Sequence, residues 1–542
     1  MTRHSVIKGA LILSITGFGV RFVGLGLRVV LNSFIGDEGL GLYGAAYPIY
    51  STLLALSTAG IPVAISKLVS QHMTVKDYQG AYRVFLLSLS LVTMSGLIIS
   101  IIMFMSAPYL AQHIVKDPRA FYPIAAIAPA VFFAAVMSCF RGFFQGQQQM
   151  MPTAVSQIFE QLFRVGAALF LVVLLLPLGL EFAAAGATFG AAAGAVAGLL
   201  VLLLLFFRGR SSFMAGMARQ QRAKHPKNGE TLRSILYLSI PITLSHLVIP
   251  LQSLIDLFTV HFRLEEIGFD ESRRLALYGQ LTNIAAPIIH IPQILTVALA
   301  VSLLPAISEA SALNNRGMIR FRASLALRLS FLLGLPSAVG IFILAEPLTM
   351  LLFQNQEAGR PLAYMSLAVL FIALYQTSSA ILQGLGKTHI PLVNLTVGAV
   401  TKILCNWFLV AIPALNINGA AVGSVAGFFV SSTLNLYHIR SLTGLRLDYM
   451  RTYIKPVISG IFMGVVVYLS YTYSLAGLTE PAGLLSFSLS NAVATLGSVA
   501  LGIASYGLAL FVLGTLDRED LLLIPRYGPF ILQLALRLRL LK

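Results

Sequence analysis

Long apolar stretches, separated by short polar loops, run along almost the whole chain. A helix needs about 20 mostly apolar residues to cross the hydrocarbon core of a bilayer. Fourteen stretches meet this requirement, near residues 7–34, 42–67, 83–109, 120–146, 153–178, 182–207, 234–259, 279–306, 323–353, 361–385, 390–412, 417–438, 453–476 and 486–514. The pattern predicts an all-α polytopic membrane protein with about fourteen transmembrane helices.

The composition agrees with this prediction and excludes several classes of soluble protein. Of the 542 residues, 57% are hydrophobic and only 11% are charged, whereas soluble proteins carry about 25% charged residues. The formal net charge of +17 comes from basic residues in short loops, without the basic and aromatic segment of a nucleic-acid binder. Cys139 and Cys405 are far apart in apolar runs, so neither a disulfide framework nor a metal site is expected.

The placement of lysine and arginine orients the spans, because basic residues are enriched in cytoplasmic loops. With the N-terminus in the cytoplasm, the even-numbered loops and both termini hold 26 basic residues and the odd-numbered loops hold six. The remaining five lie within spans. Both termini are therefore predicted to be cytoplasmic, in a multi-pass protein of the bacterial plasma membrane.

Short motifs recur at nearly constant spacing. LGLYG (40–44) matches LALYG (275–279), and AAG (184–186) matches AVG (421–423). QG dipeptides at 145 and 383 each precede a proline. The offsets of 235 to 239 residues predict two parallel six-helix repeats around a central cavity, as in many transporters. The predicted domains are an N-terminal bundle, a basic cytoplasmic linker, a C-terminal bundle, two additional helices and an amphipathic cytoplasmic tail: 1–207, 208–233, 234–440, 441–514 and 515–542.

Two arginines lie deep in the first span. Arg21 and Arg28 are seven residues apart, so they share one helix face. Arginine keeps its charge when dehydrated and binds phosphate through two hydrogen bonds. The pair would suit a pyrophosphate, and the structural alternative is that both arginines pair with internal acids or carbonyl groups.

Four further charges lie within spans. Glu160 and Arg164 are four residues apart in the fifth span, a spacing that favours an intrahelical ion pair. Counted from the repeated proline, the partner of Arg164 falls at or next to Lys402. Asp256 is the one acid of the seventh span, and it is a candidate for cation coupling or for pairing with Arg21 or Arg28.

Motifs for enzymatic chemistry are missing from the sequence. It contains no GxxxxGK[ST] loop for ATP, no HExxH and no paired Cys-x-x-Cys. Acids and bases are not clustered in the outward loops, which argues against an embedded transferase. A membrane transporter without metal or organic cofactor is therefore expected.

The run GFFQGQQQMMPTAVSQIFEQLFRV (142–165) resembles the signature of the stage V sporulation protein B-like polysaccharide transporters. GIPVAISKLVSQ (60–71), ALAVSLLPAIS (298–308) and IPRYGPFILQLALRLRLLK (524–542) extend the resemblance over essentially the whole chain. These transporters belong to the multidrug/oligosaccharidyl-lipid/polysaccharide exporter superfamily, which also contains the lipid II flippases. The resemblance implies two six-helix bundles around a cavity, two added helices, and export of a lipid-linked cell-wall precursor.

In the lipid II flippases, arginines of the first span line a cationic cavity, and Arg21 and Arg28 resemble them. Their arginine before a proline in the eighth span has no counterpart in AAPIIHIP (285–292). An acid near the start of their second span is missing unless Asp37 or Glu38 replaces it. The exact saccharide is therefore left open.

The hypothesis from the sequence is alternating-access flipping of an undecaprenyl-pyrophosphate-linked saccharide, with lipid II as the leading candidate, for peptidoglycan synthesis and cell shape. Arg21, Arg28, Arg164 and Lys402 would bind the head group, while Glu160 and Asp256 would serve coupling or charge pairing. The membrane potential, with Na⁺ or H⁺ as an optional coupling ion, would drive transport.

Expected partners are the lipid-linked substrate, the bilayer and the cell-wall machinery, and the protein is expected to be a monomer that binds no nucleic acid. The alternatives are a cation-coupled multidrug antiporter, a flippase for a capsule, O-unit or spore-cortex precursor, and a scaffold for wall synthesis.

Overall fold

A computed structural model describes residues 3–58, 60–218, 228–479 and 487–515. Within these ranges the chain is helical and forms no strand, which confirms the predicted fold class. Two compact units divide between Asn283 and Ile284. Residues 219–227 of the predicted linker and residues 516–542 of the predicted tail lie outside the described residues. The assignment of domains from the sequence repeat stays a prediction.

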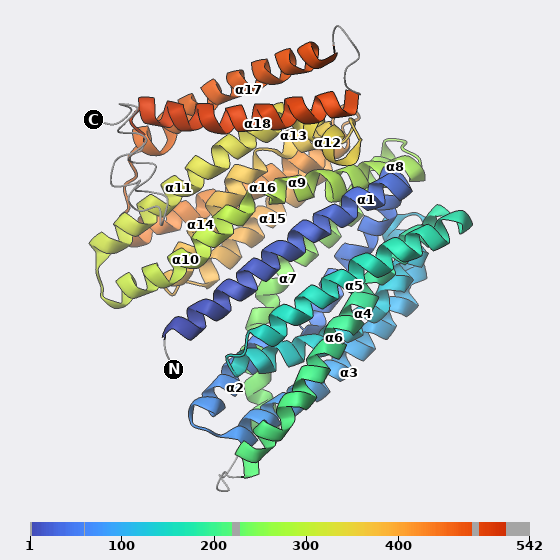
Figure 1. Ribbon diagram of the computed structural model, residues 1–542, viewed down its shortest axis with the longest axis vertical. Helices are drawn as coiled ribbons and strands as arrows, with labels where there is room; N and C mark the ends of the chain where they lie inside the picture. The colour runs from blue at the N-terminus through green and yellow to red at the C-terminus, as the bar shows by residue number, and fades with distance from the viewer. Residues whose placement is uncertain (1–2, 59, 219–227, 480–486, 516–542) are drawn as a thin grey trace. The chain divides into compact units, whose positions relative to one another are not determined.

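The first unit contains eight α-helices among its described residues. They are α1 (Arg3–Thr58), α2 (Ile61–Thr74), α3 (Tyr78–Leu110), α4 (Phe121–Gly146), α5 (Met151–Leu175), α6 (Leu180–Ala218), α7 (Asn228–Glu266) and α8 (Glu271–Gly279). Helices α3 to α6 pack side by side as a bundle (Figure 1), and α1 packs along α4, α5 and α6. The described parts of the predicted hydrophilic linker are helical, because α6 continues to Ala218 and α7 begins at Asn228.

The second unit begins within the predicted eighth span. Its α-helices are α9 (Ala286–His290), α10 (Gln293–Ala312), α11 (Arg316–Ile343), α12 (Ala345–Phe353), α13 (Gly359–Met365), α14 (Ala368–Gly384), α15 (His389–Leu409), α16 (Ile417–Thr443), α17 (Lys455–Thr479) and α18 (Phe487–Val512). The predicted span 279–306 is interrupted by the π-helical turn η4 (Gln280–Ala285) and again at Pro292. Helices α17 and α18 pack together and against α11 and α12, so they lie beside the second bundle as the sequence predicted.

The number of spans depends on how the first helix is counted. Among the described residues, twelve helices are long and apolar enough to cross a membrane, or thirteen if the bent pair α13 and α14 is one span. The first of them, Phe22–Thr74, contains the second predicted span and residues 22–34 of the first. Gly36 separates the two with φ 62° and ψ −173°, a left-handed backbone that glycine adopts without steric cost. In Figure 1, α1 rises from the N-terminus towards α8, and α2 lies back near the N-terminal end. The chain therefore reverses at this break.

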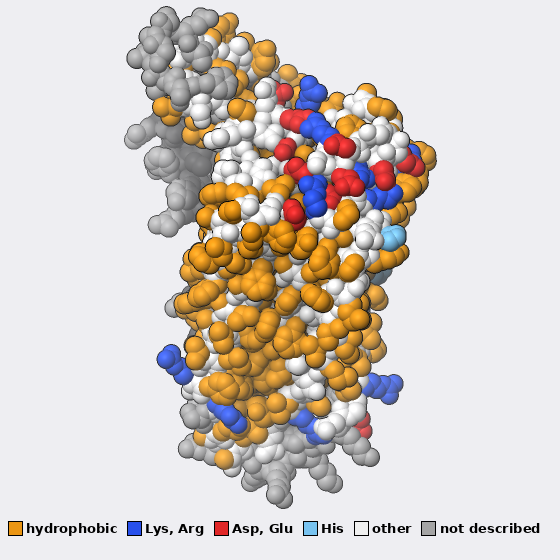
Figure 2. All heavy atoms as spheres, turned by 90° about the vertical axis from the view of Figure 1, so that its right-hand side faces the viewer, with side chains coloured by type: hydrophobic (Ala, Val, Ile, Leu, Met, Phe, Trp, Pro, Cys, Tyr) orange, Lys and Arg blue, Asp and Glu red, His pale blue; other side chains and the backbone are white. Residues whose placement is uncertain are grey.

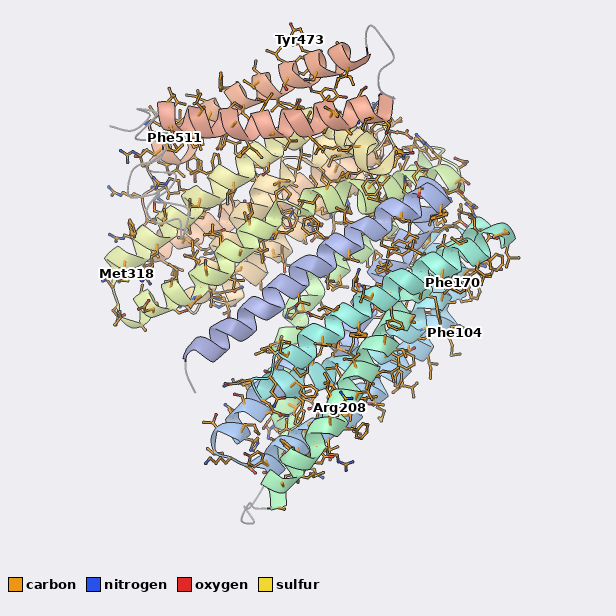
Figure 3. The ribbon with its side chains drawn as sticks, in the orientation of Figure 1. Phe104, Phe170, Arg208, Met318, Tyr473 and Phe511 are labelled. Atoms are coloured by element: carbon orange, nitrogen blue, oxygen red, sulfur yellow. The ribbon has the colours of Figure 1, made fainter. Side chains whose placement is uncertain are left out.

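Apolar side chains cover the outside of the helices as well as their interior. Phe104 on α3 and Phe170 on α5 project outward from the first unit (Figure 3) and are 55% and 68% exposed. Inside the same unit, Phe85, Phe140 and Phe143 pack together in a buried aromatic cluster. An apolar surface of this extent fits acyl chains rather than water, because exposed apolar patches on soluble proteins rarely exceed a few hundred Å².

Candidate functional site

Helix α6 positions the charged part of α5 through four glycines spaced four residues apart. A Cβ atom at Gly190 would lie 2.6 Å from the carbonyl oxygen of Arg164, and one at Gly194 would lie 2.5 Å from that of Glu160. Gly186 and Gly198 meet Leu171 and Ser156 of α5 in the same way. Small residues at this spacing let two membrane helices approach until their backbones touch. Close packing on α6 therefore fixes the backbone of α5 at Glu160 and Arg164.

Glu160 accepts hydrogen bonds from two arginines on different helices. Arg164 Nη2 donates to Oε1 at 2.6 Å, which confirms the intrahelical pair expected from the sequence. Arg141 Nη2, on α4, donates to Oε2 at 2.8 Å. All three side chains are largely buried: Arg141 is 17% exposed, Glu160 16% and Arg164 25%. The triad carries one net positive charge inside an apolar bundle.

Arg141 was missed by the sequence analysis, which counted it with the basic residues at the ends of spans. It lies five residues before the end of α4, directly before the 142–165 run. The sequence offered only a weak signal for its role, an arginine placed just inside an apolar span. Its partner lies 19 residues away, across a helix connection.

Arg28 lies on α1 and is partly buried, and its guanidinium makes no hydrogen bond or ion pair with any described residue. Arg21 lies in the same helix, but its side chain is outside the described residues. Both Arg28 and Arg164 interact electrostatically with Tyr43 of α1. The structure therefore brings these two predicted residues to a common place in the first unit.

Three tyrosines of α1 complete the surroundings of the triad. Tyr43 donates a hydrogen bond to the Tyr47 hydroxyl at 2.9 Å, and Tyr50 interacts electrostatically with Arg164, Glu160 and Arg141. Positions 43, 47 and 50 share one face of a helix, so the spacing of these tyrosines in the sequence was a signal for the cluster. Tyrosine hydroxyls can donate to phosphate oxygens and to sugar hydroxyls.

Lys402 and Asp256 belong to other helices. Lys402 belongs to α15 of the second unit, where a Cβ atom at Gly427 of α16 would lie 3.1 Å from the Lys402 Cβ. The contact of Arg164 has the same form, since a Cβ atom at Gly194 of α6 would lie 3.0 Å from the Arg164 Cβ. The assignment of Lys402 as the repeat partner of Arg164 stays a prediction. Asp256 of α7 interacts electrostatically with Tyr278 of α8.

The repeated motifs LGLYG and LALYG pack against each other. A Cβ atom at Gly41 would lie 2.0 Å from the carbonyl oxygen of Leu275, and one at Gly279 would lie 2.3 Å from that of Asp37. Asn283 Nδ2 donates to the carbonyl oxygen of Leu40 at 2.9 Å. Helices α1 and α8 are thus in backbone contact just beyond Gly36, and no path remains between them at this point.

A charged network surrounds this contact. Arg119 Nη1 donates to Glu38 at 2.8 Å, and its Nη2 donates to the buried Asp117 at 2.8 Å and to Ser272 at 3.3 Å. Lys116 pairs with Glu265. Figure 2 shows acidic and basic side chains gathered beyond one edge of a broad hydrophobic band. The network joins three predicted odd-numbered loops at one end of the first unit, as alternating spans require.

The described residues contain no group of three or more histidine, cysteine, aspartate or glutamate side chains arranged to hold a metal ion. The chemistry that the first unit offers is binding by arginine and tyrosine donors. Such donors suit an anionic, oxygen-rich group.

Comparison with known proteins decides the family. The family model for polysaccharide biosynthesis proteins matches residues 6–311, and the MatE model matches residues 269–408. Stage V sporulation protein B of Bacillus subtilis is 30% identical over 537 residues, which cover 98% of this chain and 100% of that protein. The chain belongs to the polysaccharide biosynthesis protein family. The resemblance seen in the sequence is thereby confirmed.

Two further similarities place this family member among transporters. The lipid II flippase MurJ of Bacillus subtilis is 28% identical over 482 residues, which cover 85% of this chain and 88% of that protein. A solved structure of the lipid II flippase MurJ in an inward closed conformation matches with a TM-score of 0.63 at 15% identity, covering 92% of this chain and 98% of that one. The fold is shared, and the prediction of a membrane transporter rather than an enzyme is confirmed.

Proposed function

We propose that this protein is a flippase that moves an undecaprenyl-pyrophosphate-linked saccharide from the inner to the outer leaflet, with lipid II as the leading candidate. The observation that carries the proposal is the arginine cluster of the first unit. Arg28 has no carboxylate partner among the described residues, and Arg164 shares its one carboxylate with Arg141. An ionisable group at mid-membrane costs at least about 2.5–3.5 kcal/mol, so an excess of cations there calls for an anionic ligand.

The mechanism follows from the chemistry of these side chains. Arg28 and Arg164 bind pyrophosphate oxygens, and the tyrosine hydroxyls of α1 donate to the head group, while the lipid tail stays in the bilayer. Arg21 and Lys402 are further head-group ligands in this proposal. Contact between α1 and α8 closes one end of the path along which the head group moves. When this contact opens, the head group reaches the leaflet at that end. The closed end carries odd-numbered loops. Because both termini are expected to be cytoplasmic, this end is the outer one.

The membrane potential supplies the driving force in this proposal. Outward movement of a negative charge down a negative-inside potential yields about 2.3 kcal/mol per charge per 100 mV. An ATPase is then unnecessary, and a coupling cation bound at Asp256 is an optional addition.

The test is transport of fluorescent lipid II by purified protein in liposomes under an imposed potential, scored by accessibility in the outer leaflet. We expect potential-dependent flipping, its loss in Arg28→Gln, and its retention in the control Arg208→Gln, since Arg208 is an exposed residue of α6 (Figure 3). Both variants must elute as monodisperse protein. Full activity of Arg28→Gln would refute the head-group assignment.

A second candidate is a cation-coupled multidrug antiporter, which the MatE match to residues 269–408 favours. Its cationic substrates would be repelled by the arginine cluster. Uptake of cationic dyes against a proton or sodium gradient, without flipping of lipid II, would support it. Flipping of a capsule, O-unit or spore-cortex precursor in preference to lipid II would keep the mechanism and change the saccharide.

A further inference from the structure

The two arginines around Glu160 are engaged to different extents. Arg141 uses both donors on one edge of its guanidinium, Nε to Ser156 Oγ at 3.0 Å and Nη2 to Glu160 Oε2 at 2.8 Å. Ser156 in turn donates its proton to the carbonyl oxygen of Thr153 at 2.7 Å, so its hydroxyl oxygen is free to accept from Arg141. Both donors of this guanidinium edge, Nε and Nη2, are therefore engaged, and the Arg141 side chain is fixed.

Arg164 uses only one donor of the corresponding edge. Its Nη2 donates to Glu160 Oε1 at 2.6 Å, whereas its Nε is buried and has no hydrogen-bond partner among the residues that the structure describes. When a carboxylate and the Nε–Nη2 edge of an arginine have no other partners, they prefer to form two parallel hydrogen bonds. No second bond of this kind forms here, and Oε2 of the same carboxylate accepts from Arg141 instead.

We propose that Arg141 is a positioning residue that occupies one oxygen of Glu160 and thereby keeps Arg164 available to the substrate. The proposal rests on the proposed function, in which Arg164 binds the anionic head group. Without Arg141, Glu160 takes both donors of the Arg164 edge and withdraws that arginine from the substrate.

The net charge of the triad also predicts that loss of Arg141 weakens binding of the anionic head group. The triad of Arg141, Glu160 and Arg164 carries a net charge of +1. Removal of Arg141 leaves a neutral pair that attracts no anion. Removal of both Arg141 and Glu160 restores the charge of +1 and leaves Arg164 without a competing carboxylate.

The experiment compares three variants in the lipid II liposome assay, with initial rates measured over a range of substrate concentrations. For Arg141→Gln we expect the half-saturating concentration to rise by about tenfold, the loss that one charged hydrogen bond explains. For Arg141→Gln/Glu160→Gln we expect most of the affinity to return. For Glu160→Gln/Arg164→Gln, which has the same net charge but retains only Arg141, we expect no recovery.

The outcomes separate this inference from the proposed function. A double variant Arg141→Gln/Glu160→Gln that is as weak as Arg141→Gln would overturn the inference and assign Arg141 a merely structural role. Equal activity of the two double variants would also overturn it, because net charge alone would then suffice. Loss of flipping in Arg164→Gln with an unaffected Arg141→Gln would reject the inference and keep the function. Unimpaired flipping in Arg164→Gln would reject the head-group site itself. Monodisperse elution of every variant shows that differences do not reflect unfolding.

Discussion

At the scale of single residues, the first unit tolerates a carboxylate in an apolar bundle because two cations share it. Glu160 has one arginine donor on each oxygen, and it separates two positive charges that would otherwise repel each other. Removal of one member of a buried ion pair is costly because the remaining charge loses its compensation. The arrangement gives Glu160 a role in the stability of the first unit.

Replacement of Glu160 by glutamine is predicted to destabilise the fold. Arg141 and Arg164 would face each other without an anion, at a cost of about 3–5 kcal/mol. The matched control is Glu309→Gln, because Glu309 is 62% exposed and pairs with Arg322. An exposed pair contributes about 0–1 kcal/mol. Thermal unfolding in detergent measures both variants, and equal melting temperatures would contradict the prediction.

At the scale of elements, the contact between α5 and α6 decides where the triad lies. The glycines of α6 bring its backbone against the carbonyl oxygens of α5. Lipid tails are as apolar as leucine, so association of membrane helices depends on such close packing rather than on the hydrophobic effect. A small displacement of α5 would move Glu160 and Arg164 away from α4 and α1.

A methyl group at Gly194 is predicted to separate the two helices. Its Cβ atom would lie 2.5 Å from the carbonyl oxygen of Glu160, so α5 must move. Overpacking of this kind costs about 1–3 kcal/mol, and we expect Gly194→Ala to lower the melting temperature and reduce flipping. Gly166→Ala on α5 is the control, because a Cβ atom there meets nothing within 4 Å. A control that is as impaired as Gly194→Ala would refute the packing argument.

At the scale of the whole molecule, the backbone contact of α1 with α8 defines a closed end. The contact joins corresponding motifs of the two sequence repeats, and Arg119 holds the loops around it through Glu38, Asp117 and Ser272. In the proposed function, this contact forms and breaks in each transport cycle. The hydrogen bonds of the charged network would then be released when the end opens.

A bulky residue at Gly41 is predicted to hold this end open, since its Cβ atom would lie 2.0 Å from the Leu275 carbonyl oxygen. The readout is labelling of Ala45→Cys by a membrane-impermeant maleimide, after Cys139 and Cys405 have been replaced by alanine. Ala45 is fully buried and one turn from Gly41. We expect faster labelling in Gly41→Leu than in the parent. Unchanged labelling would show that the contact does not close the path.

The sequence by itself determined the spans and the local charge pair. Hydrophobic length is a local property, because each helix must satisfy its own backbone hydrogen bonds within the bilayer, so the predicted stretches reappear as helices. The pairing of Glu160 with Arg164 also depends only on the helical repeat and was predicted. The break of α1 at Gly36 falls in the loop that was predicted between the first two spans, where Asp37 and Glu38 interrupt the apolar sequence.

The tertiary structure alone decided which charges share a site. Arg141 reaches Glu160 from another helix, and Arg28 comes to the same tyrosine as Arg164, through the packing of α1, α4 and α6 around α5. The repeated motifs LGLYG and LALYG were recognised as similar, but their mutual contact was not predicted. Contacts between helices depend on side-chain shape over distances of many residues, which a one-dimensional pattern of polarity does not contain.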